Sequence, residues 1–576
     1  MCESHEPRPV DDEPQNQHQH QHHQKPRTRL LPSQTSSSAT SATSSWSPGG
    51  PLFRAECAAL LGMGVPLALA SMLDRSSLWV TTAFIGRHGG AAELGPASLA
   101  STVNNVLGTS VNIGLSLAVQ TLASQAAGAG DDDALRKALQ RSFPVNLLFS
   151  LPVMALLLLL EPLLIALGRP RAFASAAAAY GACILPVAPL VGAQRAMTSW
   201  LAALKITRPP LLINLALVPL HALLTYVLVE RTPLGYLGAG VAQSAVSLAR
   251  AAATYCYIRI SPRCAHGWPD GLRVREACSG WAAYLRLALP GVLFLAEFWV
   301  GELLVFAAAL LPQPAAVLSA FAIYQLTNAT CYQPPGGLRV AVGARVGNAL
   351  GAATPAAARR AWVGGLLLVG AWLGVPALLL GTLTRPWASL FTDDEAVAAL
   401  LFALVPWLVV YVSLDALLAI NAGALTGCGR QGVGGRLALL SYVAIGLPAA
   451  LLLAFGTPLG AVGIAMGHTL GKLFMTASTG WAVARTDWRA QSAAAVERIA
   501  GQAGRAAAAG VTDAPGAGDR GDRAQAIELK RAPLDGSGAG AEEEEEEALR
   551  DEEKGEEAER VGDQVPAWVA PAGTRG

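Results

Sequence analysis

Long apolar blocks alternate with short polar segments along most of this chain. Twelve predominantly apolar windows are each long enough to cross a bilayer as a helix, which takes about 20 residues. Several contain Pro or Gly, which membrane helices tolerate because neighbouring groups satisfy the freed backbone. The pattern predicts an all-α integral membrane protein with twelve transmembrane helices. The windows are 58–85, 98–127, 143–167, 176–204, 209–229, 235–258, 284–311, 315–343, 359–383, 396–427, 433–455 and 460–484.

The two ends of the chain lack this pattern. Residues 1–54 are rich in Gln, His, Ser and Pro and contain no apolar signal-peptide core, so they are expected to be a disordered tail. Residues 486–576 include EEEEEEALRDEEKGEEAER and are expected to form a disordered acidic tail. Metal binding by QHQHQHHQ and a regulatory role for the acidic tail stay open as alternatives.

The helical region contains an internal repeat. TPLGYLG begins at Thr232 and TPLGAVG begins at Thr457, 225 residues later. The repeat divides the region into an N-lobe at 55–258 and a C-lobe at 281–485, joined by a cytoplasmic linker at 259–280. Each copy holds six windows, so both copies run in the same direction, as in some transporters. We expect two pseudo-symmetric six-helix lobes around a central cavity.

Composition and charge refine this picture. Only 14% of the residues are charged, whereas soluble domains usually contain about 25%. The net charge of +1 indicates no nucleic-acid partner, and the eight cysteines have no metal-like spacing. If the N-terminus is inside, the inner loops carry fourteen Lys and Arg residues and the outer loops carry five, which predicts that both termini are cytoplasmic.

Three carboxylates lie inside apolar windows. Glu297 and Glu302 interrupt LPGVLFLAEFWVGELLVFAAALL, and Asp415 interrupts LLFALVPWLVVYVSLDALLAI, one helical turn after Tyr411. A charge at the bilayer centre costs about 2.5–3.5 kcal/mol, so such residues are interpreted as functional. Glu297 and Glu302 are about 140° apart around a helix and face different neighbours. Reversible protonation or cation binding is the expected role, and buried structural hydrogen bonding is the alternative.

Five motifs follow one another at regular places in the chain. They are FIGRHGGAAELGPASLA, LASQAAGAG, LPGVLFLAEFWVGELL, RVGNALGAATPAAARRA and YVSLDALLAINAGALTGCGRQGVGG. Their order and spacing resemble those of the multidrug and toxic compound extrusion (MATE) family, in its eukaryotic branch, over about residues 55–485. The resemblance implies alternating-access antiport of organic cations, drugs or secondary metabolites against protons. It also implies proton coupling by Glu297 and Asp415, with Glu302 as a second acid that contacts the substrate.

Aromatic and amide side chains near these acids complete the expected substrate site. Each aromatic ring could hold an organic cation with about 0.5–2 kcal/mol, and simple helix packing is the alternative. No cofactor or metal is expected beyond the coupling proton, and sodium is disfavoured because no oxygen-dense cluster stands out. The expected partners are the bilayer and small organic substrates, with a monomer as the working unit. The substrate candidates are Trp299, Tyr324, Tyr332, Tyr411, Asn105 and Asn328.

One acid in the first window is interpreted as structural. Bacterial MATE proteins often have a coupling Asp six residues before the basic residue of the following loop, and that position here is Thr81. Asp74, next to Arg75, does not take its place. A lipid or lipid-linked sugar flippase of the same superfamily is the rival function. A membrane enzyme is less favoured because no nucleophile, metal cluster or nucleotide loop accompanies the acids. The plasma and vacuolar membranes are both compatible locations.

Overall fold

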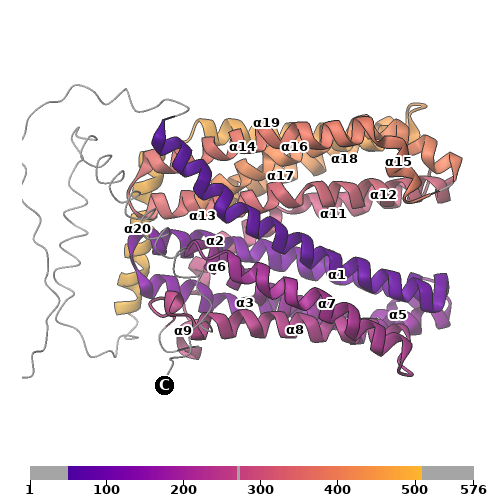
Figure 1. Cartoon of the computed structure of the whole chain (residues 1–576), viewed down its shortest axis with the longest axis horizontal. Helices are drawn as coiled ribbons and strands as arrows, with labels where there is room; N and C mark the ends of the chain where they lie inside the picture. The colour runs from indigo at the N-terminus through magenta and orange to yellow at the C-terminus, as the bar shows by residue number, and fades with distance from the viewer. Residues whose placement is uncertain (1–49, 269–270, 272, 393, 509–576) are drawn as a thin grey trace, which may run out of the picture. The chain divides into compact units, whose positions relative to one another are not determined.

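The computed structural model describes residues 50–268, 271, 273–392 and 394–508, and every regular element in these ranges is a helix (Figure 1). The all-α prediction is therefore confirmed for the described residues. Most of the two predicted tails, 1–49 and 509–576, lies outside them.

The first half of the chain forms α1 to α8. Helix α1 is interrupted at Gly90, whose φ of 59° is a conformation that glycine adopts readily. The interruption lies between the first two predicted windows. The elements are α1 (Pro51–Val103), the π-helix η1 (Asn104–Thr109), α2 (Ser110–Ala129), α3 (Asp132–Leu158), α4 (Leu160–Ala166), α5 (Arg171–Cys183), α6 (Val187–Ala203), α7 (Arg208–Glu230) and α8 (Tyr236–Ile260).

The linker and the second half complete the helical region. The linker contains η2 (Pro262–Cys264) and α9 (Val274–Ala277). The second half comprises α10 (Trp281–Leu293), α11 (Ala296–Ala308), α12 (Pro314–Cys331), α13 (Gln333–Gly351), α14 (Pro355–Thr382), α15 (Thr384–Ser389), α16 (Glu395–Gly427), α17 (Gln431–Ala438), the π-helix η3 (Leu439–Gly446), α18 (Leu447–Phe455), α19 (Gly460–Ala484) and α20 (Trp488–Ala508).

Nine helical stretches among the described residues are long and apolar enough to cross a membrane. Helices also occupy the three remaining windows, 235–258, 315–343 and 460–484, as α8, as α12 with α13, and as α19. Because these three are outside the nine, the count of twelve spans stays a prediction.

Helix α2, in the first half of the chain, packs against helices of the second half. It packs closely against α13, where a Cβ atom on Gly351 would collide with the backbone oxygen of Gln125. Small residues allow such close approach of membrane helices. The side chains of α2 also reach α16: the Thr121 hydroxyl donates to the Thr426 carbonyl at 2.5 Å, and the Gln125 amide donates to the Gly427 carbonyl at 2.8 Å. Hydrogen bonds from polar side chains of α2 therefore stabilise its contact with α16.

Residues 488–508 differ from the prediction of a disordered tail from residue 486, because they form helix α20. Its sequence is rich in Ala and also contains three Arg residues, and both are good helix formers. The Asp487 carboxylate accepts hydrogen bonds from the backbone N–H groups of Arg489 and Ala490, at 3.0 and 3.1 Å, and so caps the helix start. Helix α20 packs against α13 and α14 and also against α2 and α3 (Figure 1).

Candidate functional site

The window that contains two glutamates is broken into two helices. Helix α10 ends at Leu293 and α11 begins at Ala296. The connecting residues make tight hydrogen bonds, from Leu295 N–H to the Val292 carbonyl and from Phe298 N–H to the Leu295 carbonyl, both 3.0 Å. The break places Glu297 in the first turn of α11. Unpaired N–H groups and the helix dipole favour a negative charge at that position.

A lysine links the two predicted coupling carboxylates. The ammonium of Lys472, on α19, lies 2.5 Å from Glu297 and 2.8 Å from Asp415 of α16. The side chain of Lys472 is fully buried, and those of Glu297 and Asp415 are 24% and 13% exposed. Buried charges are tolerated when they are paired with charges of the opposite sign. Two carboxylates and one ammonium leave the group with a formal charge of −1.

Aromatic side chains enclose the same charges. The hydroxyl groups of Tyr411 and Tyr442 both donate to Glu297, the latter at 2.9 Å. The Lys472 ammonium lies 4.6 Å from the ring centroid of Tyr411 and 5.6 Å from that of Tyr442, within the range of cation–π attraction. The imidazole of His468 is 4.9 Å from the Tyr411 ring, measured between centroids. Helices α11, α16 and α19 and the π-helix η3 thus meet at one polar cluster.

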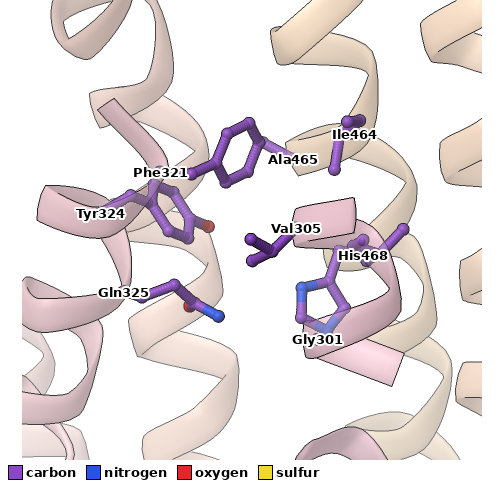
Figure 2. A pocket seen from close by; sticks show the side chains of 9 residues that line it. Gly301, Val305, Phe321, Tyr324, Gln325, Ile464, Ala465 and His468 are labelled. Atoms are coloured by element: carbon purple, nitrogen blue, oxygen red, sulfur yellow. The ribbon is translucent and has the colours of Figure 1, made fainter. Parts of the chain in front are cut away.

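A small pocket adjoins this cluster (Figure 2). It lies between α11, α12 and α19 and shares His468 with the cluster. Tyr324, which lines the pocket, has its ring 6.3 Å from that of Tyr411. The pocket therefore offers apolar and aromatic surface beside the paired carboxylates. Its lining consists of Gly301, Leu304, Val305, Phe321, Tyr324, Gln325, Ile464, Ala465 and His468.

The predicted residues outside the cluster have different surroundings. Glu302 is half-buried and makes no hydrogen bond or ion pair with the residues that the structure describes. Trp299 turns toward the first half of the chain, where its indole N–H donates to the Val106 carbonyl at 3.2 Å. Asn105 is exposed in η1. Asn328 and Tyr332 are half-buried near the junction of α12 and α13, and the side-chain oxygen of Asn328 has no hydrogen-bond partner among the described residues.

Asp74 is held in a separate group of charges. Its carboxylate pairs with Arg195 at 3.0 Å and with Arg250. The nearby Thr81 hydroxyl lies 3.5 Å from the imidazole of His221, which is buried. The ion-paired group of Asp74, Arg195 and Arg250 has a formal charge of +1, and the neighbouring Arg75 adds a further positive charge. The pairing supports the structural interpretation of Asp74.

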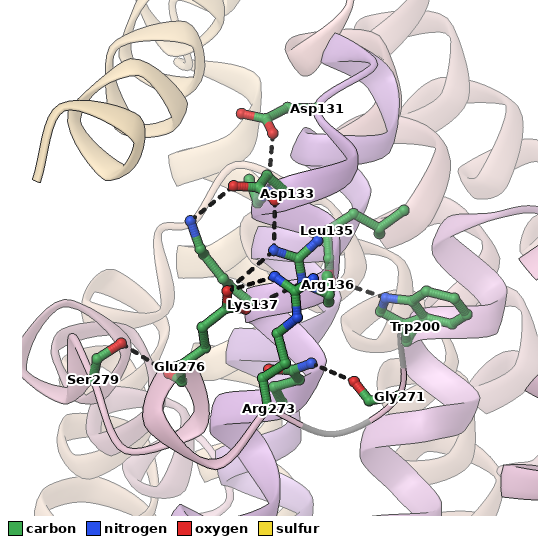
Figure 3. Close-up of polar contacts among 12 residues, drawn as sticks. Asp131, Asp133, Leu135, Arg136, Lys137, Trp200, Gly271, Arg273, Glu276 and Ser279 are labelled. Atoms are coloured by element: carbon green, nitrogen blue, oxygen red, sulfur yellow. Dashed lines mark hydrogen bonds and ion pairs between the residues drawn. The ribbon is translucent and has the colours of Figure 1, made fainter. Parts of the chain in front are cut away.

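A third polar network attaches the linker to α3 (Figure 3). Arg136 of α3 donates to Glu276 of α9 at 3.1 Å, and both side chains are 7% exposed. Arg273 donates to the same carboxylate at 3.1 Å, and the Gln140 amide donates to the Gly271 carbonyl at 2.9 Å. Every carboxylate oxygen of Glu276 is therefore engaged, which makes this network an anchor for the linker.

Sequence reasoning missed three members of the cluster, Lys472, His468 and Tyr442. The first two lie in the window 460–484, one helical turn apart, and a search for ionisable residues of both signs inside the windows would have found them. Tyr442 carries no such signal, because one tyrosine among many in apolar windows does not reveal which helix it faces.

The chain matches one family twice. Residues 66–227 and residues 291–452 each match the MatE family. Both ends of the second match lie 225 residues after those of the first, which is the displacement of the TPLG repeat. The comparison therefore supports the internal repeat.

Similar proteins include plant and mammalian transporters. "Protein DETOXIFICATION 16" of Arabidopsis thaliana is 30% identical over 440 residues, which cover 76% of this chain and 90% of that protein. "Multidrug and toxin extrusion protein 2" of Mus musculus is 31% identical over 443 residues, covering 76% of each chain. The crystal structure of the eukaryotic MATE transporter AtDTX14 matches with a TM-score of 0.74 and 25% identity, over 78% of this chain and all of that one.

Proposed function

Because this chain belongs to the MATE family of membrane transporters, we propose that it is a secondary antiporter that exports organic cations in exchange for protons. The observation that carries the proposal is the sharing of Lys472 by Glu297 and Asp415, beside an aromatic pocket. The substrates we expect are drugs or secondary metabolites with one positive charge.

The charge of the cluster explains how exchange would be coupled. With a formal charge of −1, the two carboxylates and Lys472 are one positive charge short of neutrality. One proton on a carboxylate supplies that charge, and so does one monovalent organic cation. Because an uncompensated charge at bilayer depth is costly, the protein would cross between its two states mainly with one of them bound. Competition for one site then couples the two fluxes with a ratio of one to one.

Protons fit this cluster better than sodium does. Sodium prefers a shell of several hard oxygen ligands, whereas the described groups around Glu297 and Asp415 include the Lys472 ammonium and aromatic rings rather than a dense set of oxygens. A flippase for lipids or lipid-linked sugars is the alternative function. Its phosphate-bearing substrate would be repelled by the negative cluster, and the aromatic rings of Tyr324, Tyr411 and Tyr442 suit a cation instead.

Two six-helix lobes around a central cavity, with both termini cytoplasmic, are part of the proposal. The repeat and the distribution of Lys and Arg support this arrangement, and alternating access would move one lobe against the other. We propose a monomer in the plasma or vacuolar membrane as the working unit. Glu302, Asn328 and Tyr332 are proposed to contact substrate elsewhere along its path, and Asn105 and Trp299 to do so from the side of the first half.

The test is efflux of a fluorescent organic cation from proteoliposomes, driven by a pH gradient. Glu297→Gln keeps the shape and hydrogen bonding of the side chain but cannot exchange a proton, so we expect pH-driven efflux to fall at least about 100-fold. Lys472 stays paired with Asp415 in this variant, which favours correct folding. Asp415→Asn should weaken coupling, and Glu302→Gln should mainly raise the apparent substrate constant.

Glu395→Gln is the matched control, because Glu395 is an exposed acid at the start of α16, the helix that carries Asp415. It should leave efflux and its pH dependence unchanged. Wild-type efflux with an unchanged pH profile in folded Glu297→Gln protein would contradict the proposed coupling. Movement of a phospholipid analogue without any organic-cation flux would favour the flippase.

A further inference from the structure

The surroundings of the Lys472 ammonium are those of a receptor for organic ammonium ions. Two carboxylates contact it, from Glu297 and Asp415, at 2.5 and 2.8 Å. Two aromatic rings face it, those of Tyr411 and Tyr442, at 4.6 and 5.6 Å from their centroids. Carboxylates and aromatic faces together are the groups that bind alkylammonium ligands. The side chain of Lys472 has no exposed surface, so its ammonium has exchanged water for these groups alone.

We infer that this cage is an alkylammonium-binding site whose resident ligand is the protein's own Lys472. A free organic ammonium enters the cage only when the Lys472 ammonium moves aside within the cluster, so that Lys472 still contributes to the formal charge of −1 that the incoming cation neutralises. The inference names the substrate-recognising element of the proposed function and, as far as transport is concerned, rests on it. The cage itself can be tested by binding alone.

A tethered ammonium has a clear physical effect on affinity. Its effective concentration at the cage is of millimolar order or higher, because the side chain cannot diffuse away. Free alkylammonium ions must compete with it, so small amines should bind the unmodified protein weakly. Cations with apolar or aromatic substituents would gain additional contacts with side chains that line the adjoining pocket, such as Phe321 and Tyr324. Competition with Lys472 thus lowers the affinity of every free cation for the cage, and the additional contacts favour organic cations over small inorganic ones.

The tether also keeps the empty site intact. Without Lys472, the carboxylates of Glu297 and Asp415 would face each other with no counter-charge, and repulsion in a buried site is strong. Truncation to alanine removes three methylene groups and the ammonium, and so opens a space of the size of n-propylammonium. The shortened site should therefore take up n-propylammonium from solution.

The experiment measures thermal unfolding of the purified full-length protein in detergent. In Lys472→Ala, n-propylammonium chloride should raise the unfolding temperature saturably, by about 2 °C or more at ten times its Kd. The same additive should shift the unmodified protein and Lys472→Met by less than a third of that amount, because their side chains fill the space. n-Propanol, which has the same shape without the charge, should shift none of the three proteins saturably.

Equal responses of Lys472→Ala to n-propylammonium and to n-propanol would overturn the inference. If Lys472→Ala does not fold, the Asp415→Asn/Lys472→Ala protein, which keeps one carboxylate for one cation, is tested in the same way, and its response decides. Binding is separable from transport. If n-propylammonium raises the unfolding temperature of Lys472→Ala saturably but the unmodified protein transports no organic cation, only the proposed function is contradicted. If the unmodified protein transports organic cations but the unfolding temperature of Lys472→Ala does not rise, only the inference about the cage is contradicted.

Discussion

Two groups of charged side chains inside the helices of this protein contain ion pairs that partly compensate their charges. Glu297 and Asp415 share Lys472, and Asp74 is shared by Arg195 and Arg250. The first group carries one excess negative charge and the second one excess positive charge. Neutralising Glu297 leaves Lys472 paired with Asp415, whereas neutralising Asp74 leaves Arg195 and Arg250 without their shared counter-charge, which is costly. We therefore expect similar substitutions in the two groups to have different effects on the stability of the protein.

Asp74→Asn should destabilise the protein without abolishing exchange. Arg250, whose side chain is only 9% exposed, loses its counter-charge, and the expected loss is about 2–4 kcal/mol. Thermal unfolding in detergent measures it. Asp74→Asn/Arg250→Gln removes both charges and should recover at least half of the lost unfolding temperature. An unfolding temperature equal to that of the unmodified protein in Asp74→Asn, or a folded variant without pH-driven exchange, would contradict the structural role of Asp74.

The sequence predicted the carboxylates of the site but not its cation. Glu297 and Asp415 stand out because an acid inside a long apolar window is costly and is therefore interpreted as functional. Lys472 also lies inside a long apolar window, so a criterion that covers basic as well as acidic residues includes it. The pairing itself could not be predicted, because the four helical elements that carry the cluster are brought together by packing that leaves no local trace in the sequence.

The apolar windows predict where helices lie, but they predict helix bounds and interruptions poorly: the window at 143–167 begins eleven residues after α3 does. Each of the twelve windows coincides with helix in the structure, but the break between Leu293 and Ala296 and the π-helix η1 fall inside windows that look continuous. Hydropathy reports burial in the bilayer and not the hydrogen-bond pattern of individual turns. The missed break matters, because it places Glu297 at a helix start.

The contact of α2 with α13 should tolerate no side chain at its closest points. Gly351→Ala puts a methyl group against the backbone of Gln125, so we expect a loss of about 1–3 kcal/mol in stability. Gly370→Ala is the matched control, because no atom lies within 4 Å of its added methyl group and Ala favours the interior of α14. Unfolding temperatures of the two variants, measured in parallel, should differ by several degrees. Equal values would show that α2 and α13 are not in close contact in the membrane-extracted protein.

On the scale of the whole chain, the distribution of basic residues predicts a single orientation. Arg136 and Arg360 lie within the first two turns of α3 and α14, and Arg430 directly precedes α17, all in segments assigned to the inner side. Epitope tags on Met1 and Gly576 should both resist protease added to intact cells and should be digested after permeabilisation. Digestion of one tag in intact cells would require an odd number of spans and would contradict the twelve-helix prediction.

Helix α20 connects parts of the molecule that are far apart in the sequence. The Ser492 hydroxyl donates to the Leu350 carbonyl of α13 at 3.1 Å, and the Arg498 guanidinium donates to the Gln125 side chain of α2. Ile499 packs against a cluster formed mainly by first-half residues, whereas Ala495 is buried in a cluster formed mainly by second-half residues. A helix with contacts to both halves stabilises any state in which α2 and α13 are together.

Removing α20 should therefore loosen the contact between α2 and α13. A chain ending at residue 487 loses the helix, and a chain ending at residue 510 keeps it and is the control. We introduce Ser124→Cys, on α2 beside Gly347 of α13, and measure its modification by a water-soluble maleimide. Because Ser124 is fully buried, the control should react slowly, and the shorter chain should react at least about fivefold faster, since losing α20 shifts the population toward states with α2 and α13 apart. Equal modification rates in the two folded proteins would mean that α20 packs against α2 and α13 without stabilising their contact.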